Sequence, residues 1–321
     1  VDLGAMASAT KLIAPAVPFG VLLIAFTLLC LLLQVFISYK KYAQYLKWLA
    51  VVLLSYVFST LMIELDWKEV LRNTVIPALS FSKEHLLLIT AVLGTTISPY
   101  LFFWQTSQEV EEEILQGKTS IASRVGATDK EITDMRVDIW SGMGISNLVM
   151  FFIIAACAAT LHAAGITSIT SAAQAAEALR PLAGDRAALL FTLGIVGAGL
   201  LAVPVLAGAA SYALAESFGW RYGLYRKWKK ALAFYGVIAL SMAIGFVVNF
   251  VGLDPIAALI AAAVANGLIA PIVLVLIVKI SSNKKIMGER VNGRFTTLLG
   301  FLVVGIMALA GIATIISLMV R

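Results

Sequence analysis

The stretch Gly94-Thr95-Thr96-Ile97-Ser98-Pro99-Tyr100-Leu101-Phe102-Phe103-Trp104 places a proline and several hydroxyl groups inside an apolar segment long enough to cross a bilayer. Pro99 has no backbone N–H and its ring clashes with the carbonyl four residues earlier, so helical hydrogen bonding should fail around Thr95 and Thr96. Carbonyls left without partners in a membrane require protein or water to satisfy them. In secondary transporters, broken helices of this kind supply carbonyl ligands to ions. The stretch therefore predicts a helix break at Pro99 with a binding site beside it.

The composition is typical of a membrane protein. Of the 321 residues, 61% are hydrophobic and only 13% are charged. About 20 apolar residues span a bilayer as a helix. Eight runs of about this length occur, at residues 17–37, 47–63, 86–104, 143–163, 187–215, 231–251, 255–280 and 295–320. We therefore expect an all-α, polytopic helical membrane protein embedded in a lipid bilayer.

The basic residues predict how the chain is oriented in that bilayer. The net charge is +6, but Lys and Arg lie in short connections between the apolar runs, which favours membrane orientation over nucleic-acid binding. Cytoplasmic connections are enriched in Lys and Arg. If the connection that holds Lys40, Lys41 and Lys47 is cytoplasmic, its side of the membrane carries 17 of the 24 Lys and Arg residues. We therefore predict that this side is the cytoplasm.

The longest polar stretch, residues 106–141, is then a cytoplasmic loop within the transmembrane domain. Thr128 is a suitable N-cap for a helix that begins there. The stretch is rich in acidic residues: Glu109, Glu111, Glu112, Glu113, Asp129, Glu131, Asp134 and Asp138. We interpret them as a solvated helix end, because Asp and Glu are mostly exposed. The alternative is a pore mouth that concentrates cations.

Several segments, in order, are similar to one known family. Asp2-Leu3-Gly4-Ala5 resembles Asp-Leu-Ala-Glu on the third helix of the Nramp divalent metal ion transporters, and Gly94 to Tyr100 resembles Gly-Ala-Thr-Val-Met-Pro-His on the broken sixth helix. Ser146-Asn147-Leu148 is similar to the seventh helix, and Ala187 to Gly208 to the eighth. The resemblance covers nearly the whole chain. It implies one transporter domain, residues 1–321, truncated at its N-terminus so that the first helix, with its Asp-Pro-Gly-Asn metal ligands, is missing.

The resemblance also implies a fold and a function. The fold would be the broken-helix, inverted-repeat (LeuT-like) transporter bundle. Its function would be secondary transport of divalent metal cations, Mn, Mg or Fe, across the plasma membrane of a bacterium, with proton coupling left open. The metal ion would be a substrate, with no cofactor and no enzymatic activity. An organic-solute carrier, of the amino-acid type and with the same architecture, is the alternative function.

Three departures from the family pattern affect the chemistry expected of the site. Ser98 stands where the family has a metal-binding Met, and a hydroxyl is a harder ligand than a thioether. Tyr100 replaces a His, and Ala5 replaces a Glu of the proton route. Asp2 remains as a carboxylate in an apolar helix, where charge is costly and usually functional. We place Asp2 and Tyr100 on the proton or cation pathway, with a hydrated chain end as the alternative for Asp2.

Two amides complete the candidate site. Asn266 lies one turn from the position of a family Gln that reaches the metal, and an amide oxygen is a suitable hard ligand. Thr95 and Ser98, together with Asn266, are therefore the candidate metal ligands. Asn147 is a weaker candidate. For both amides the alternative is an interhelical hydrogen bond of the kind polar residues make in membrane bundles.

Overall fold

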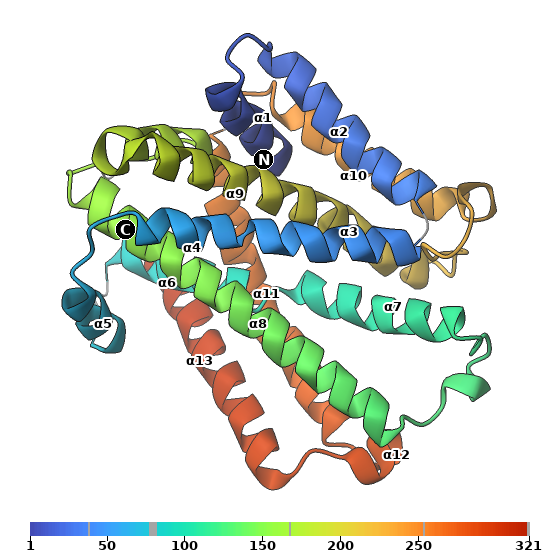
Figure 1. Cartoon of the computed structure of the whole chain (residues 1–321). Helices are drawn as coiled ribbons and strands as arrows, with labels where there is room; N and C mark the ends of the chain where they lie inside the picture. Colours follow the sequence, from blue (N-terminus) through green and yellow to red (C-terminus); the bar gives the residue numbers. More distant parts are fainter. Residues whose placement is uncertain (38, 77–81, 167, 253, 320–321) are drawn as a thin grey trace. The chain divides into compact units, whose positions relative to one another are not determined.

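The computed structural model describes residues 1–37, 39–76, 82–166, 168–252 and 254–319 (Figure 1). Within these ranges every regular element is helical. The α-helices are α1 (Asp2–Ile13), α2 (Phe19–Phe36), α3 (Tyr39–Val52), α4 (Leu54–Leu61), α5 (Trp67–Val75), α6 (Lys83–Thr96), α7 (Pro99–Leu115), α8 (Asp129–Cys157), α9 (Ala172–Ser217), α10 (Leu232–Val248), α11 (Pro255–Ser281), α12 (Lys284–Met287) and α13 (Arg294–Met319). Short 3-10 turns are η1 (Ala122–Arg124), η3 (Trp228–Lys230) and η4 (Gly288–Arg290), and η2 (Ala158–His162) is a π-helical turn.

The apolar helices match the runs expected from the sequence. Six helical stretches of the described chain are long and apolar enough to cross a membrane: Phe19–Phe36, Lys83–Leu115, Asp129–His162, Gly184–Ser217, Pro255–Ser281 and Arg294–Met319. Two shorter apolar helices, Trp48–Leu61 and Leu232–Val248, account for the other two predicted runs. The prediction of an all-α polytopic membrane protein is confirmed.

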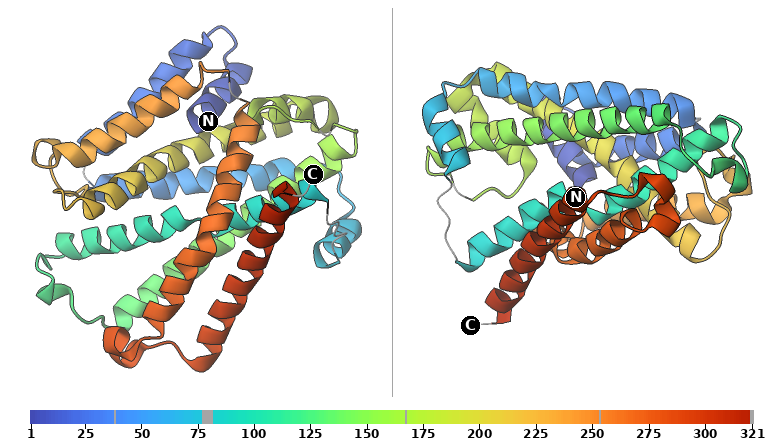
Figure 2. Two further views of the ribbon diagram at one scale, coloured as in Figure 1. Left: turned by 180° about the vertical axis from the view of Figure 1, so that it is seen from behind. Right: turned by 90° about the horizontal axis from the view of Figure 1, so that it is seen from below.

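The chain divides into two compact units, of which the first comprises residues 1–71 and 103–256. Its central element is α9, against which α1, α4 and α10 pack. Helices α2 and α10 lie side by side, as both Figure 1 and Figure 2 show. The core of this unit is apolar and includes the fully buried side chains of Met6, Tyr212 and Phe234. Between membrane helices, such close packing of side chains is one of the main interactions that hold the helices together.

Helix α9 is interrupted at one residue. Gly184 has φ +85°, a left-handed backbone conformation that glycine adopts at no steric cost. The apolar part of α9 begins at this point and continues to Ser217, and it contains the predicted run 187–215. Gly184 therefore separates the spanning part of α9 from the more polar turns that precede it.

The second unit comprises residues 72–102 and 257–321, and its main elements are α6, α11 and α13. Two hydroxyl groups join α6 to α13: Thr90 Oγ1 and Thr314 Oγ1 are 2.7 Å apart, and Thr314 donates to the carbonyl of Leu86 at 3.1 Å. Helices α6 and α11 meet at glycines. A Cβ on Gly94 would lie 2.1 Å from the carbonyl oxygen of Ala263. The absence of a side chain at Gly94 thus allows the two backbones to touch.

The predicted loop 106–141 is largely helical. Helix α7 continues to Leu115, and α8 begins at Asp129, so only residues 116–128 form the connection. Thr128 is the N-cap of α8, as the sequence predicts, and it forms a capping box with Glu131. Glu131 also lies 2.7 Å from the Lys118 ammonium, and this hydrogen bond raises the pKa of Lys118. The connection is therefore tied to the start of α8.

Candidate functional site

The segment that contains Pro99 is discontinuous. Helix α6 ends at Thr96, and α7 begins at Pro99. Ile97 still donates to the carbonyl of Leu93 at 3.0 Å, but its φ of −121° and ψ of 68° lie outside the helical region. A proline is favourable at the first position of a helix, where an N–H would have no partner inside the helix. The break and the start of the new helix therefore have the same cause.

The side chain of Ser98 satisfies the carbonyls beside the break. Its hydroxyl is 2.7 Å from the carbonyl oxygen of Gly94 and 3.0 Å from that of Thr95, and the side chain is 1% exposed. The expectation of a bare carbonyl is therefore wrong for Thr95, because a local hydroxyl replaces the missing backbone donor. A hydroxyl has one proton and two lone pairs. With its proton directed at these carbonyls, the Ser98 oxygen keeps its lone pairs for another ligand.

Thr95 and Tyr100 flank this hydroxyl along the chain. The side chain of Thr95 is exposed and donates to the carbonyl of Val92 at 2.9 Å, within its own helix. Its backbone carbonyl is the group that meets Ser98. Tyr100 is half-buried in the first turn of α7. Thr95 thus contributes an oxygen to the break through its backbone and not through its side chain.

Asn266 lies on α11 next to the point where this helix meets α6. A Cβ on Gly94 would lie 2.4 Å from the backbone nitrogen of Gly267, so the two glycines are in contact. Asn266 is therefore adjacent in sequence to one contacting glycine, and Thr95 is adjacent to the other. The side chain of Asn266 is half-buried and has no hydrogen-bond partner within the described ranges. Thr95 and Asn266 thus each follow or precede a glycine of this contact, and Ser98 contacts the carbonyls of Gly94 and Thr95 at the end of α6.

The other two candidates belong to the first unit. Asp2, at the start of α1, is half-buried and lines a cavity of about 260 Å³ together with Ser241 and Gly245. Asn147 is exposed on α8 and donates to the carbonyl of Met143, one turn earlier, at 2.8 Å. The hydrogen bond of Asn147 is thus within its own helix and not between helices.

Most of the acidic stretch faces one cavity of about 660 Å³. Its acidic lining residues are Glu109, Glu112, Glu113, Glu131, Asp134 and Asp138. Across the described part of the chain, no group of three or more His, Cys, Asp or Glu side chains is arranged to hold a metal ion. The acidic residues therefore make the electrostatic potential in this cavity more negative, but they do not form a metal-binding site.

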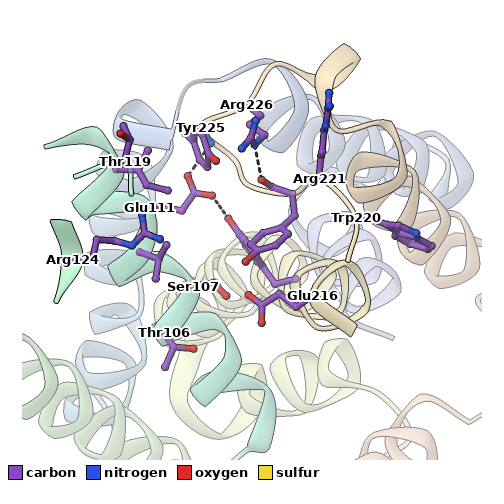
Figure 3. Close-up of a pocket in the computed structure, with 14 residues that line it drawn as sticks. Thr106, Ser107, Glu111, Thr119, Arg124, Glu216, Trp220, Arg221, Tyr225 and Arg226 are labelled. Atoms are coloured by element: carbon purple, nitrogen blue, oxygen red, sulfur yellow. Dashed lines mark hydrogen bonds between the residues drawn. The ribbon is translucent and has the colours of Figure 1, made fainter. Parts of the chain in front are cut away.

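Glu111 differs from its acidic neighbours because its side chain is only 2% exposed. Its Oε1 accepts from the Tyr212 hydroxyl at 2.5 Å and from the backbone N–H of Leu224 at 2.6 Å. Its Oε2 accepts from the N–H of Tyr225 at 2.8 Å, and Figure 3 shows Glu111 next to Tyr225. The interpretation of the acidic residues as a solvated helix end is therefore wrong for Glu111. Through these hydrogen bonds, the Glu111 carboxylate links α7 to α9 and to the connection between α9 and α10.

A signal for the burial of Glu111 exists in the sequence. Trp104, Ser107 and Glu111 are spaced by three and four residues, so they lie on one face of a helix. In the structure this face packs on α9: the ring of Trp104 is 6.1 Å from that of Tyr212, and Ser107 is buried. Helical spacing from an apolar residue could thus have distinguished Glu111 from the exposed acids.

Comparison with known proteins agrees with the sequence motifs. The family described as natural resistance-associated macrophage protein-like (Nramp) matches residues 2–317. Three similar proteins are each named divalent metal cation transporter MntH. The one from Pectobacterium carotovorum is 27% identical over 257 residues, which are 78% of this chain and 57% of that protein. Those from Yersinia enterocolitica and Klebsiella pneumoniae (strain 342) are 28% and 30% identical, each over 73% of this chain and 52% of the relative. The chain thus spans about half the length of the curated relatives it matches.

Proposed function

The chain belongs to the Nramp family, and we propose that it carries out secondary transport of divalent metal cations across a bacterial plasma membrane. The observation that carries this proposal is the discontinuous helix at Pro99. The proteins similar to this chain are named divalent metal cation transporters. Discontinuous helices supply ion ligands in secondary transporters. The same break supports a broken-helix, inverted-repeat architecture. The break is common to both candidate functions, and the names of the similar proteins favour metal ions over organic solutes.

The ligands we propose are all oxygens. They are the hydroxyl of Ser98, the carbonyl of Thr95 and the amide of Asn266. Hard oxygen ligands suit Mg²⁺ and Mn²⁺, whereas a thioether suits softer ions. Because Ser98 is 1% exposed, a cation reaches its lone pairs only when the helix break opens. We therefore propose that Mn²⁺ or Mg²⁺ is preferred over Cd²⁺, relative to family members that carry Met at this position.

Substitution of Ser98 tests this ion preference. In the full-length protein, Ser98→Met should shift competition between Mn²⁺ and Cd²⁺ toward Cd²⁺, by about 1 to 2 kcal/mol if one soft contact is comparable to other single-site discriminations. Ser98→Ala is the matched control, because it removes the hydroxyl without adding sulfur. Asn266→Leu should weaken affinity for both ions equally. The measurement is uptake of radioactive Mn²⁺ into liposomes with Cd²⁺ as competitor. Equal competition in wild type and Ser98→Met would show that position 98 does not set selectivity.

We propose that Asp2 carries the proton or cation that accompanies the metal. The support is its position as a half-buried carboxylate beside a cavity that Ser241 also lines. In the full-length protein, Asp2→Asn should abolish the acceleration of Mn²⁺ uptake by an inward proton gradient, because an amide does not titrate. Affinity for Mn²⁺ should persist. Uptake rates measured with and without the gradient check this, and an unchanged gradient effect in Asp2→Asn would remove Asp2 from the pathway.

A further inference from the structure

A second polar cavity lies away from the helix break, in the first unit. Its volume is about 560 Å³, within the range of small-molecule sites. It is lined by the last turns of α7 and α9 and by the two connections that follow these helices, residues 116–128 and 218–231. Both helices are the final parts of spanning stretches, Lys83–Leu115 and Gly184–Ser217. The cavity therefore lies where spans end, at the level expected for lipid headgroups.

Three arginines line this cavity, and none of them forms an ion pair with a carboxylate of the described chain. Arg226 is half-buried, donates to the carbonyl of Tyr222 at 3.0 Å and lies over the Tyr225 ring at 4.8 Å. Arg124 is half-buried and donates to the carbonyl of Lys118 at 3.1 Å. These contacts orient the guanidinium groups but do not neutralise them. Arg221 is exposed and has no partner within the described ranges.

The two carboxylates in the cavity are engaged with neutral donors. Glu111 accepts hydrogen bonds from the Tyr212 hydroxyl and from two backbone N–H groups, of Leu224 and Tyr225. The Tyr222 hydroxyl is the polar neighbour of Glu216. Figure 3 shows Arg124 on one side of Glu111, with Arg221 and Arg226 on another. Glu111 also interacts electrostatically with Arg226, but three guanidinium groups against two carboxylates leave the lining with a net positive charge, which favours a bound anion.

We propose that this cavity binds a phosphate group through Arg124, Arg221 and Arg226. A guanidinium matches phosphate oxygens with two parallel N–H donors, which a Lys ammonium does not. Lys227, Lys229 and Lys230 follow in the same connection and increase the positive charge. Basic clusters next to the end of a span are typical of segments that bind anionic headgroups. Trp220 also lines the cavity, and tryptophan is enriched at the membrane interface. The phosphate belongs either to an anionic phospholipid or to a soluble phosphate compound.

The test compares these two sources on the purified full-length protein in neutral detergent. Phosphatidylglycerol, phosphatidylcholine and inorganic phosphate are titrated separately, and the midpoint of thermal unfolding gives each apparent affinity. Arg124→Gln combined with Arg221→Gln removes two guanidinium groups. Arg221→Gln alone is a milder variant that loses no partner within the described ranges. Lys284→Gln combined with Lys285→Gln removes the same charge from α12 and is the control.

Phosphatidylglycerol should bind the wild type and the lysine control with equal affinity. Its affinity should fall about fivefold in Arg221→Gln and about 25-fold in the double arginine variant, because each basic residue lost lowers the affinity about fivefold. Phosphatidylcholine should bind weakly to all. The same dependence on arginine for inorganic phosphate, without a lipid effect, would support the proposal and identify the soluble source. Equal binding to the arginine and lysine variants, or no binding of either phosphate to the wild type, would overturn it. Metal uptake is not part of this readout, so its outcome is independent of the proposed transport.

Discussion

Glu111 shows how a charged residue is accommodated inside this helical protein. All three of its hydrogen-bond partners are donors, so the carboxyl group acts as an acceptor only, which is the pattern of the ionised form. None of these partners is a formal cation. Without Glu111, the N–H of Tyr225 would lose its partner, and the N–H of Leu224 would keep only the Tyr212 hydroxyl oxygen at 3.2 Å. The carboxylate and the connection therefore stabilise each other.

Replacement of Glu111 tests this mutual stabilisation. Glu111→Ala leaves the Tyr212 hydroxyl and the N–H of Tyr225 without an acceptor, and leaves the N–H of Leu224 only the Tyr212 oxygen at 3.2 Å, so we expect the free energy of unfolding to fall by about 3 kcal/mol. Glu112→Ala, at the exposed neighbouring position, is the control and should change it by about 0.5 kcal/mol or less. Thermal unfolding of the purified variants measures both effects. Equal stability of the two variants would show that the hydrogen bonds of Glu111 contribute little.

Residue-level features differ in how far the sequence alone predicts them. The break at Pro99 follows from a clash between neighbouring residues, so the local sequence is sufficient. The hydroxyl of Ser98 donates hydrogen bonds to the carbonyls three and four residues earlier, so this interaction is also local in sequence. Glu111 instead meets N–H groups 113 and 114 residues away. Such partners depend on the packing of α7 against α9, which one sequence does not specify.

At the scale of elements, the crossing of α6 and α11 depends on two glycines. A Cβ on Gly267 would lie 2.4 Å from the carbonyl oxygen of Thr90, just as a Cβ on Gly94 would meet the backbone of Ala263. Small residues of this kind allow close helix packing in membranes, where the hydrophobic effect does not drive association between helices. Thr95 and Asn266, two of the proposed ligands, are the neighbours in sequence of these two glycines. Packing and the proposed ion site thus rest on the same contact.

Addition of a methyl group at this crossing should therefore affect both properties. Gly94→Ala requires α6 and α11 to separate, so we expect a lower melting temperature and weaker Mn²⁺ binding. Gly305→Ala is the matched control on α13, because no atom lies within 4 Å of the added Cβ there. The free energy of unfolding of Gly305→Ala should rise by up to about 1 kcal/mol, because alanine has a higher helix propensity than glycine. Melting curves with and without Mn²⁺ measure both effects, and similar curves for the two variants would contradict the close contact.

Element boundaries show the limits of hydropathy as a predictor. The apolar runs predict where helices cross the bilayer, because the requirement for 20 apolar residues is strict. They miss the polar parts: α8 begins at Asp129, before the run that starts at residue 143, and α9 begins at Ala172, before the run at residue 187. A helix outside the membrane needs no apolar run. In α8 the capping box at Thr128 and Glu131 sets the start instead.

For the whole molecule, the distribution of basic residues predicts which connections face the cytoplasm. That prediction places Lys130 inside and Lys68 outside. Both residues are exposed, which makes them suitable sites for a reporter. Cys30 is buried and Cys157 is partly buried, so these two cysteines should react slowly. Single cysteines at positions 68 and 130 can therefore report the orientation of the chain in a native membrane.

A thiol reagent that does not cross membranes should label Lys68→Cys in intact cells, because that connection faces outward. Lys130→Cys should be labelled only after the membrane is permeabilised. The wild-type protein, which contains Cys30 and Cys157, is the control for background reaction. Labelling of Lys130→Cys in intact cells, with Lys68→Cys protected, would reverse the orientation. The connections that line the cavity with Arg124 and Arg221 would then face outward, where phosphate from the cytoplasm does not reach them. The same labelling experiment thus also constrains which phosphate source the second cavity can meet.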